Sequence, residues 1–238
     1  MLDSVIIIPA RYQSKRLSGK PLIDLNGKPM LQRVWEKCAK AKSPNEIFIA
    51  TDDIRIKNFC KIQNYNYIMT SKKCLTGTDR IAEAAKTIKA KNFINVQGDE
   101  PLILPSDIKK MIFASSKYNY VLNAMCEVKN EKEYRSSHVP KLTVDNDNFL
   151  MYMSRSPIPG NKDNKFEYCL KQVCIYSFPR NLLLKFSKVK KKSFFEFMED
   201  IEILRFLEKG IKVKMIKVSN SSIGVDTMKD VYKVRKLI

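Results

Sequence analysis

Apolar positions in the first half of the chain form short continuous runs separated by stretches of helical periodicity. Residues 5–8 are four consecutive β-branched residues, a pattern typical of a buried strand. Residues 29–42 instead place Met30, Val34, Cys38 and Ala41 at helical spacing. We predict strands at 4–8, 46–50, 66–69 and 93–96, and helices at 29–42, from Asp53 to about Gln63, and from a cap at Thr78 through Lys89. This alternation predicts an α/β fold with a mostly parallel sheet.

The second half has a different pattern, in which strand-like segments dominate. We predict strands at 119–127, 140–145, 149–154, 168–177 and 211–217, and helices at 194–209 and about 227–238. The composition of residues 145–148 indicates a hairpin turn, and residues 159–167 indicate an exposed loop. No internal repeat or low-complexity linker divides the chain, so we expect a single domain.

The first strand leads into a cationic loop, which carries Arg11, Lys15, Arg16 and Lys20 within ten residues. Cations so close together repel one another unless water or an anion separates them. Strand ends are where open α/β sheets bind ligands, so a polyphosphate is the expected ligand. The loop matches neither the G-x-x-x-x-G-K-[ST] phosphate loop nor the G-x-G-x-x-G dinucleotide motif. These absences disfavour a P-loop kinase and a dinucleotide-binding enzyme.

Two loop carboxylates could face this cationic loop. Asp99 follows the predicted strand at 93–96, where a carboxylate could hold a Mg²⁺ that bridges phosphate oxygens; it could equally be a turn residue. Gly98, its neighbour, would let the backbone approach a ligand closely. Asp226 precedes the last predicted helix, so it could be a metal ligand or the cap of that helix.

Composition supports an enzyme that works in the cytoplasm. With 238 residues, 44% of them hydrophobic, the chain can bury a sizeable core, and seven Gly and ten Pro are too few for a disordered or fibrous chain. No apolar run is long enough to cross a bilayer, and the first residues do not form a signal peptide. The six Cys form no C-x-x-C pair, which favours reduced core thiols over a zinc site.

The net charge of +19 leaves three interpretations open. It could be a solvated lysine-rich surface, an attraction for an acidic small molecule, or a nucleic-acid-binding surface. No RRM, KH, zinc-finger or helix-turn-helix signature is present, so we expect no nucleic-acid partner. A basic nucleic-acid-binding protein on a nucleotidyltransferase scaffold is kept as the alternative from another functional class.

Taken together, these motifs resemble those of the 3-deoxy-D-manno-octulosonate (KDO) cytidylyltransferases, also called CMP-KDO synthetases. The run I-P-A-R-Y-x-S-x-R-L-x-G-K-P-L at residues 8–22 and the run N-V-Q-G-D-E-P at residues 95–101 carry most of the resemblance. Further matches, each weak alone, extend it over the whole chain: residues 26–30, 50–52, 76–83, 154–159, 175–176, 196–205 and 224–227.

The resemblance implies a Rossmann-like nucleotidyltransferase fold with a mostly parallel central sheet and an antiparallel insertion. Residues 1–118 would be mainly the nucleotide-binding half, residues from about 119 to 180 the insertion for sugar binding and dimerisation, and residues 181–238 the closing helices with the second metal carboxylate. The implied reaction converts CTP and a 3-deoxy-2-keto sugar acid into a CMP-sugar and diphosphate. Its implied setting is lipopolysaccharide biosynthesis by a cytoplasmic homodimer without membrane insertion.

The resemblance also implies roles for individual residues. The catalytic residues would be Arg11, Arg16, Lys20 and Asp99. The nucleotide would be bound by Pro9, Ala10, Arg11, Ser14, Arg16, Lys20, Thr78, Arg80 and Gln97. The sugar acid would be bound by Gln97, Lys141, Arg155, Gln172, Tyr176, Glu196 and Glu199. The cofactor would be Mg²⁺, held by Asp99 and Asp226.

Considered without the resemblance, some of these residues have simpler interpretations. Glu196, Glu199 and Glu202 recur every three residues and could form a solvated helix face. Arg155 could be a surface or ion-pair residue, and Tyr176 could be a core residue.

The sugar half departs from the family pattern. Gln172 stands where the family commonly has a His, Ser18 replaces a Pro, and residues 72–74 and 136–141 match poorly. Gln172 can still donate a hydrogen bond, but without charge. KDO is therefore the first expectation, and 8-amino-KDO or a nonulosonate-like acid is the alternative substrate.

Overall fold

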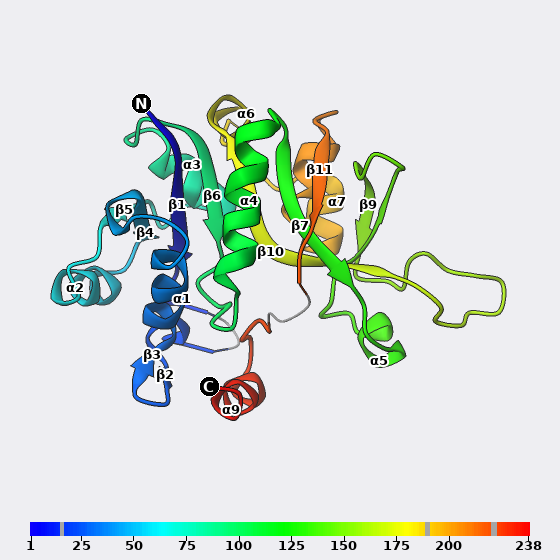
Figure 1. Ribbon diagram of the computed structural model, residues 1–238, viewed down its shortest axis with the longest axis horizontal. Coiled ribbons are helices and arrows are strands. Elements are labelled where there is room, and N and C mark those ends of the chain that lie inside the picture. The colour runs from blue at the N-terminus through cyan, green and yellow to red at the C-terminus, as the bar shows by residue number, and fades with distance from the viewer. Residues whose placement is uncertain (15–16, 189–190, 220–222) are drawn as a thin grey trace.

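The computed structural model describes residues 1–14, 17–188, 191–219 and 223–238. Within these residues, the main path of a nine-stranded sheet runs in the order β11-β7-β10-β6-β1-β4-β5 (Figure 1). The strands of this path are β1 (Leu2–Ala10), β4 (Ile47–Thr51), β5 (Tyr67–Met69), β6 (Ala90–Val96), β7 (Val121–Glu127), β10 (Leu170–Pro179) and β11 (Val213–Lys217).

The sheet is mostly parallel, as predicted. β1 pairs in parallel with β4 and β6, β4 with β5, and β7 with β11. β10 runs antiparallel between β6 and β7. Two further strands, β8 (Lys141–Val144) and β9 (Leu150–Ser154), form a hairpin, and β8 pairs with the start of β10. Residues 119–180 thus supply both this hairpin and two strands of the main path.

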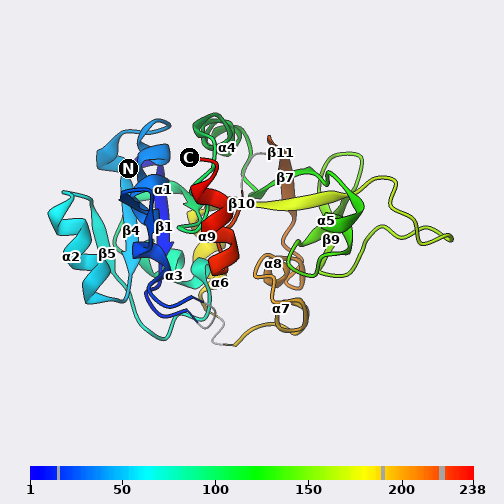
Figure 2. The same cartoon turned by 90° about the horizontal axis from the view of Figure 1, so that it is seen from below.

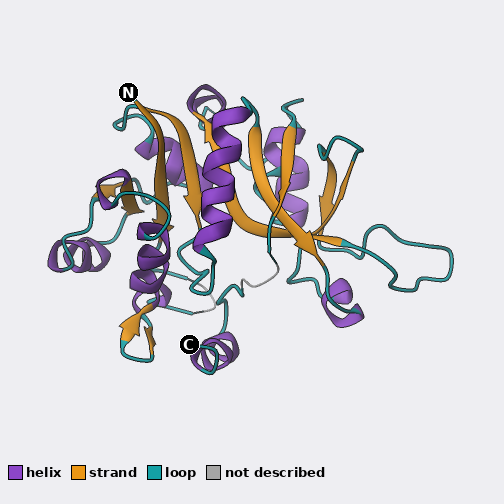
Figure 3. Cartoon of the chain, in the orientation of Figure 1, coloured by secondary structure: helices purple, strands orange, loops and turns teal. Residues whose placement is uncertain are grey.

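Helices cover both faces of the sheet (Figures 2 and 3). Along β1 the side chains alternate between two apolar clusters: Val5 and Ile7 belong to one, whereas Ile6 and Ile8 belong to the other. The helices are α1 (Met30–Ala39), α2 (Ile54–Ile62), α3 (Gly77–Ala84), α4 (Pro105–Lys117), α5 (Glu131–Arg135), α6 (Arg180–Phe186), α7 (Phe194–Glu199), α8 (Leu204–Leu207) and α9 (Met228–Arg235). Short elements complete the chain: η1 (Lys20–Leu22), β2 (Asp24–Leu25), β3 (Lys28–Pro29) and η2 (Pro44–Glu46).

Two predicted helices differ from the structure. The helix expected from Thr78 to Lys89 is capped by Thr76 and spans Gly77–Ala84, because Thr76 and Asp79 form a capping box. The helix expected at 194–209 is two helices, α7 and α8. Asp200 adopts a left-handed conformation with φ of 50°, which ends α7 and redirects the chain.

Helices α4, α5 and α6 were not predicted. Pro105 opens α4 at its first turn, and Ile108 and Met111 pack against the sheet. The proline and the spacing of the apolar residues were both visible in the sequence.

No helix within the described ranges is both long and apolar enough to cross a bilayer. The six Cys are free thiols, of which Cys174 is half-buried and the others are buried.

Candidate active site

The loops that carry the predicted site follow the carboxyl ends of β1, β4 and β6. In Figure 1, β1 and β6 run downward and the C-terminal helix α9 lies below their ends. Parallel pairing brings Ala10 of β1 beside Thr51 of β4, and Ile7 beside Asn95 of β6. Loops far apart in the sequence therefore meet at one edge of the sheet.

Lys20 is the centre of the best-defined cluster at this edge. Its Nζ lies 2.6 Å from Asp99 Oδ2 and 3.2 Å from Asp226 Oδ1. Lys20 begins η1 after Gly19, whose φ of 70° and N–H bond to Tyr12 O close the cationic loop. The predicted cation and both predicted metal carboxylates thus lie in direct contact.

Backbone contacts bring Asp226 to this cluster from the end of the chain. The Val225 N–H donates to Asp99 O at 2.9 Å. A Cβ at Gly224 would lie 3.3 Å from Glu100 Oε1, so the two loops pack closely. The cap of α9 is Thr227, through a capping box with Asp230, and not Asp226. The Asp226 side chain is therefore directed to Lys20 and not to the start of the helix.

The charges of this cluster affect one another. Burial lowers the pKa of Lys20, but the carboxylates of Asp99 and Asp226 raise it more, so the pKa lies above its ordinary value. Asp99 and Asp226 already share one cation, the Lys20 ammonium, which shows that a cation fits between them. Among the described residues, no three His, Cys, Asp or Glu side chains are arranged to hold a metal ion. Protein oxygens from this pair would leave further coordination positions for ligand oxygens.

Close packing keeps the Asp99 loop against the end of β1. A Cβ at Gly98 would lie 3.0 Å from Pro9 O, so a side chain larger than hydrogen does not fit there. Pro9 and Ala10 are buried at the end of β1, and Ser14 is half-buried in the loop that follows. Arg16 lies outside the described residues.

Arg80 is a fully buried cation beside the same edge. Its Nη1 donates to Thr70 Oγ1, and its Nη2 lies 3.3 Å from Asp52 Oδ1. Among the described residues, its Nε has no hydrogen-bond partner. Burial, with Arg11 adding to the effect, lowers the pKa of Arg80 despite Asp52. A buried guanidinium with an unused N–H is suited to a ligand carbonyl or phosphate oxygen.

A hollow of about 160 Å³ opens next to Asp52, the ion-pair partner of Arg80. Its lining residues are Arg11, Gln13, Asp52, Asp53 and Lys72. Arg11 is held there by its Nη2, which donates to Cys74 O at 2.5 Å. Arg11 was among the predicted site residues; Gln13, Asp52, Asp53 and Lys72 were not, although all four follow predicted strands.

The N-terminus of α3 contributes Thr78, whose N–H donates to Glu202 Oε2 at 2.9 Å. Gln97 Nε2 donates to Glu202 Oε1 at 3.4 Å. Burial raises the pKa of Glu202, and the hydrogen bonds from Thr76 and Thr78 offset only part of that rise. Glu202 therefore joins two predicted site residues and was itself missed. The signal was its place as the third Glu in the spacing that starts at Glu196.

Arg155 and Glu199 of the predicted sugar set hold each other. Glu199 accepts from Ser154 Oγ at 2.6 Å and from the Arg155 N–H at 2.8 Å. The Arg155 guanidinium donates to the carbonyls of Glu199, Ser137 and Asp200. These bonds fix the turn after α7 against the end of β9.

Of the remaining residues predicted to bind the sugar, Lys141 and Tyr176 are buried and Gln172 is half-buried. Lys141 is fully buried, and its Nζ donates to the carbonyls of Ser136 and Arg155. Burial lowers the pKa of Lys141. Tyr176 is 3% exposed and packs in the core, where burial raises its pKa well above the ordinary value. Gln172 Nε2 donates to Asn123 Oδ1 at 2.8 Å. In this structure the side-chain nitrogens of Lys141 and Gln172 therefore already have protein hydrogen-bond partners.

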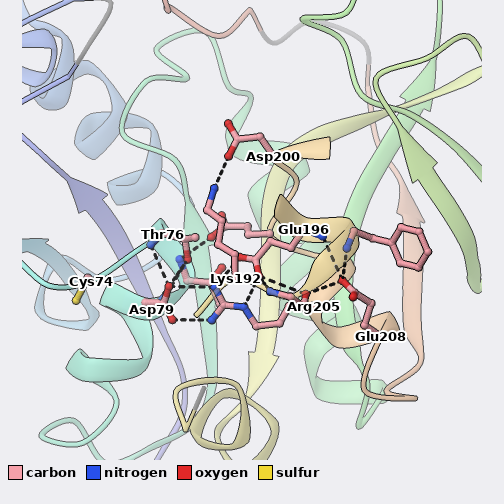
Figure 4. A network of polar contacts seen from close by, with 12 residues as sticks. Cys74, Thr76, Asp79, Lys192, Glu196, Asp200, Arg205 and Glu208 are labelled. Atoms are coloured by element: carbon pink, nitrogen blue, oxygen red, sulfur yellow. Dashed lines mark hydrogen bonds and ion pairs between the residues drawn. The ribbon is translucent and has the colours of Figure 1, made fainter. Parts of the chain in front are cut away.

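Glu196 belongs to a separate buried network (Figure 4). It is fully buried and paired with Arg205, whose Nη2 lies 2.5 Å from Glu196 Oε1. The interpretation of Glu196 as part of a solvated helix face is therefore wrong. The break at Asp200 also separates Glu196 and Glu199 from Glu202, so the three carboxylates do not share one helix face.

A larger hollow, of about 520 Å³, lies at the opposite end of β1 and β6. Met1, Ala90, Lys117 and Arg180 are among its lining residues. None of the predicted site residues lines it. Because open α/β sheets bind ligands at the carboxyl ends of their strands, the smaller hollow at that edge is the better candidate.

Comparison with known proteins identifies the family of the chain. Residues 5–216 match the family described as Cytidylyltransferase. The chain is 39% identical to the 3-deoxy-manno-octulosonate cytidylyltransferase of Trichlorobacter lovleyi, over 99% of this chain and 98% of that protein. It is 35% identical to the Escherichia coli protein of the same name, over 100% and 97% of the two chains. A solved CMP:2-keto-3-deoxy-manno-octonic acid synthetase in complex with CTP superposes with a TM-score of 0.91, at 35% identity and 99% and 98% coverage.

Proposed function

This chain belongs to the 3-deoxy-manno-octulosonate cytidylyltransferases, which are nucleotidyltransferases, and we propose that it converts CTP and KDO into CMP-KDO and diphosphate. The observation that carries the proposal is the contact of Lys20 with Asp99 and Asp226 at the carboxyl edge of the sheet. This contact joins a cation to two carboxylates at the strand ends, where open α/β sheets bind ligands, and the fold matches that of a relative solved with CTP.

In the proposed reaction, the anomeric hydroxyl of the sugar attacks the α-phosphorus of CTP in line. A new phosphorus–oxygen bond forms, the bond to the β-phosphate bridge breaks, and diphosphate leaves. The attacking hydroxyl gives up its proton to solvent water. Such a reaction asks little covalent chemistry of the protein, so positioning and neutralisation of charge carry the catalysis.

The chain's own residues would divide this task. Arg11 and Lys20 would bind phosphate oxygens, and Lys20 would stabilise the charge that develops on the leaving diphosphate. Asp99 and Asp226 would hold Mg²⁺ when it is bound, and the metal would neutralise phosphate charge and polarise the α-phosphate. Thr78 and Arg80 would lie near the base and ribose, and the Nε of Arg80 has no hydrogen-bond partner within the described part of the chain.

The proposed function is tested by incubating the purified protein with CTP, Mg²⁺ and KDO and measuring release of diphosphate. Turnover that requires both substrates is the expected result. Absence of turnover with KDO, under conditions where CTP binds, would contradict the choice of sugar.

A related sugar acid is the second candidate, and Gln172 is the observation that favours it. Its side-chain amide is already bonded to Asn123 Oδ1, so it offers a sugar a neutral donor and no charge. Parallel assays with KDO, 8-amino-KDO and a nonulosonate decide between them. The substrate with the highest kcat/KM identifies the sugar.

We further propose that the enzyme is a homodimer, active in the cytoplasm in lipopolysaccharide biosynthesis. Exposed apolar side chains gather on β9 and α7: Met151 is 65% exposed, Phe194 66%, Phe197 70% and Met198 65%. A second copy that covers this face would remove apolar surface from water. Light scattering of the purified protein should give twice the mass of one chain, 27.6 kDa. A monomer at micromolar concentration would contradict the dimer.

A further inference from the structure

The guanidinium of Arg205 joins two parts of the chain that lie far apart in sequence. Arg205, on α8, is fully buried. Its Nε and Nη2 donate to the two oxygens of Glu196 at 2.6 and 2.5 Å. Its Nη1 and Nη2 donate to the two oxygens of Asp79 at 2.8 and 3.3 Å. One guanidinium thus donates hydrogen bonds to both oxygens of two carboxylates (Figure 4).

Each of the two carboxylates caps a helix. Asp79 accepts from the Thr76 N–H at 3.0 Å and completes the capping box of α3. Glu196 accepts from the Ser193 N–H at 3.0 Å and completes the capping box of α7. Arg205 therefore holds the N-terminal turns of two helices through the same side chains that cap them.

The two helices carry residues proposed for different substrates. The first turn of α3 carries Thr78 and Arg80, the residues proposed for the nucleotide. The end of α7 carries Glu199, which fixes Arg155 and the end of β9 on the side proposed for the sugar. A displacement of either helix would therefore disturb the hydrogen bonds that Arg205 makes to the other helix.

The burial of this network makes its contacts strong. Burial lowers the pKa of Arg205, but Glu196 and Asp79 raise it more, so the guanidinium keeps its charge. The Arg205 side chain also stacks over Phe186, with its guanidinium carbon 3.8 Å from the ring centroid. Removal of one partner would leave the other charges buried with less compensation, which favours a common rearrangement over independent ones.

We propose that Arg205 is a positioning residue that couples the nucleotide side of the site to the sugar side. This inference rests on the proposed function for the identity of the two ligands. The guanidinium of Arg205 is directed at Asp79 and Glu196, and it acts through these two carboxylates. CTP binding fixes the position of α3 and, through Arg205, that of α7, which favours binding of the sugar acid. Binding of the sugar acid fixes α7 and, through Arg205, α3, which favours binding of CTP.

Two conservative variants test the coupling, each read out on the far side of the site. Glu196→Gln, on the sugar side, is expected to weaken binding of CTP by about 5-fold or more, measured by calorimetry without sugar acid. Asp79→Asn, on the nucleotide side, is expected to raise the KM for the sugar acid by about 5-fold or more at saturating CTP, with a smaller change in kcat. In both variants the amide oxygen can still accept the capping hydrogen bond.

Glu208→Gln is the matched control. Glu208 accepts from Ser193 Oγ and from the N–H groups of Phe195 and Glu196, so it supports the same turn of α7. The ion pairs of Arg205 described in the structure go instead to Asp79 and Glu196. The control should lower the Tm without changing the CTP affinity. If Glu208→Gln weakens CTP binding as much as Glu196→Gln does, the effect is general destabilisation of α7 and the coupling is wrong.

Arg205→Lys gives a second test if either carboxylate variant fails to fold. A lysine keeps the charge but cannot make the bidentate contacts, so both the CTP affinity and the sugar KM should shift. A change below about 5-fold in either readout, in folded variants, overturns the proposal. The CTP measurement needs no turnover, so it still decides the coupling if KDO proves to be the wrong sugar.

Discussion

At the scale of single residues, Lys20 determines the electrostatics of the candidate site. Its ammonium lies between Asp99 and Asp226, which would otherwise repel each other and any approaching triphosphate. A divalent cation would compete with Lys20 for the same carboxylates. When a phosphate chain enters, Lys20 can exchange the carboxylates for phosphate oxygens.

We predict that Lys20→Met lowers the rate of diphosphate release by about 100-fold or more, because a charge that neutralises the leaving group is lost. The same variant should bind Mn²⁺ more tightly than the wild-type protein in the absence of CTP, because no ammonium competes for the carboxylates. Titration followed by electron paramagnetic resonance measures this affinity directly.

Lys28→Met is the control, since Lys28 pairs with Glu36 on the surface, 46% exposed. It should leave both readouts unchanged. Equal or weaker Mn²⁺ binding by Lys20→Met would show that Lys20 and the metal do not share the carboxylates.

Glu202 is expected to make stability depend on pH. Because burial raises its pKa above the ordinary value of 4.5, the folded state keeps a proton that the unfolded state loses. The stabilisation is fully present below the unfolded pKa and is lost as the pH rises through the folded pKa.

Glu202→Gln should therefore flatten the fall of Tm with pH that begins near pH 4.5 in the wild-type protein. Scanning fluorimetry from pH 4 to pH 8 measures the difference. Glu131→Gln, which changes a 60% exposed carboxylate on α5, is the comparison. Parallel curves for wild type and Glu202→Gln would mean that Glu202 does not titrate differently in the folded state.

At the scale of elements, the N-terminus of α3 organises the site more than any single strand does. Its capping box turns Thr78 and Arg80 toward the strand ends, and Glu202 receives the Thr78 N–H from outside the helix. Gly77 packs against Gln97, with a distance of 3.3 Å from a built Cβ to Nε2. The first turn therefore has little freedom to shift.

Thr76→Ala should destabilise the protein by about 1 kcal/mol, because one capping acceptor is lost. It should also weaken CTP binding, since Thr78 and Arg80 follow directly. Urea unfolding and calorimetry give the two values.

Asn130→Ala removes the cap of α5, where Asn130 accepts from the Glu133 N–H at 3.0 Å. This control should lose a comparable free energy of unfolding while it retains CTP affinity. If both variants weaken CTP binding alike, the effect is not specific to α3.

At the scale of the whole molecule, the net charge of +19 should attract a triphosphate from a distance. We predict that the KM for CTP rises roughly 3- to 10-fold between 50 and 500 mM salt, because added salt screens this attraction. Inhibition by cytidine, which carries no phosphate, should change little over the same range. If the KM for CTP does not depend on salt, the net charge does not attract CTP and serves solubility alone.

The sequence predicted the alternation of strands and helices in the first half well, and the reason is local. Residues 5–8 are buried on both faces and so are apolar at every position, and a loop of cations needs no tertiary information to indicate an anion. It failed where one residue redirected the chain. The three glutamates at 196, 199 and 202 have helical spacing, but the left-handed Asp200 divides them between two environments.

Periodicity and short motifs were enough to predict the strands, the cationic loop and the family, because these features are contained within short segments of the chain. Which distant side chains meet became clear only from the packing of the folded chain. Lys20 and Asp226 are 206 residues apart, and Asp79 and Arg205 are 126 apart, yet each pair is in contact. Such pairs depend on how the sheet and both helix layers pack together, and the residue types near either partner carry no record of that packing.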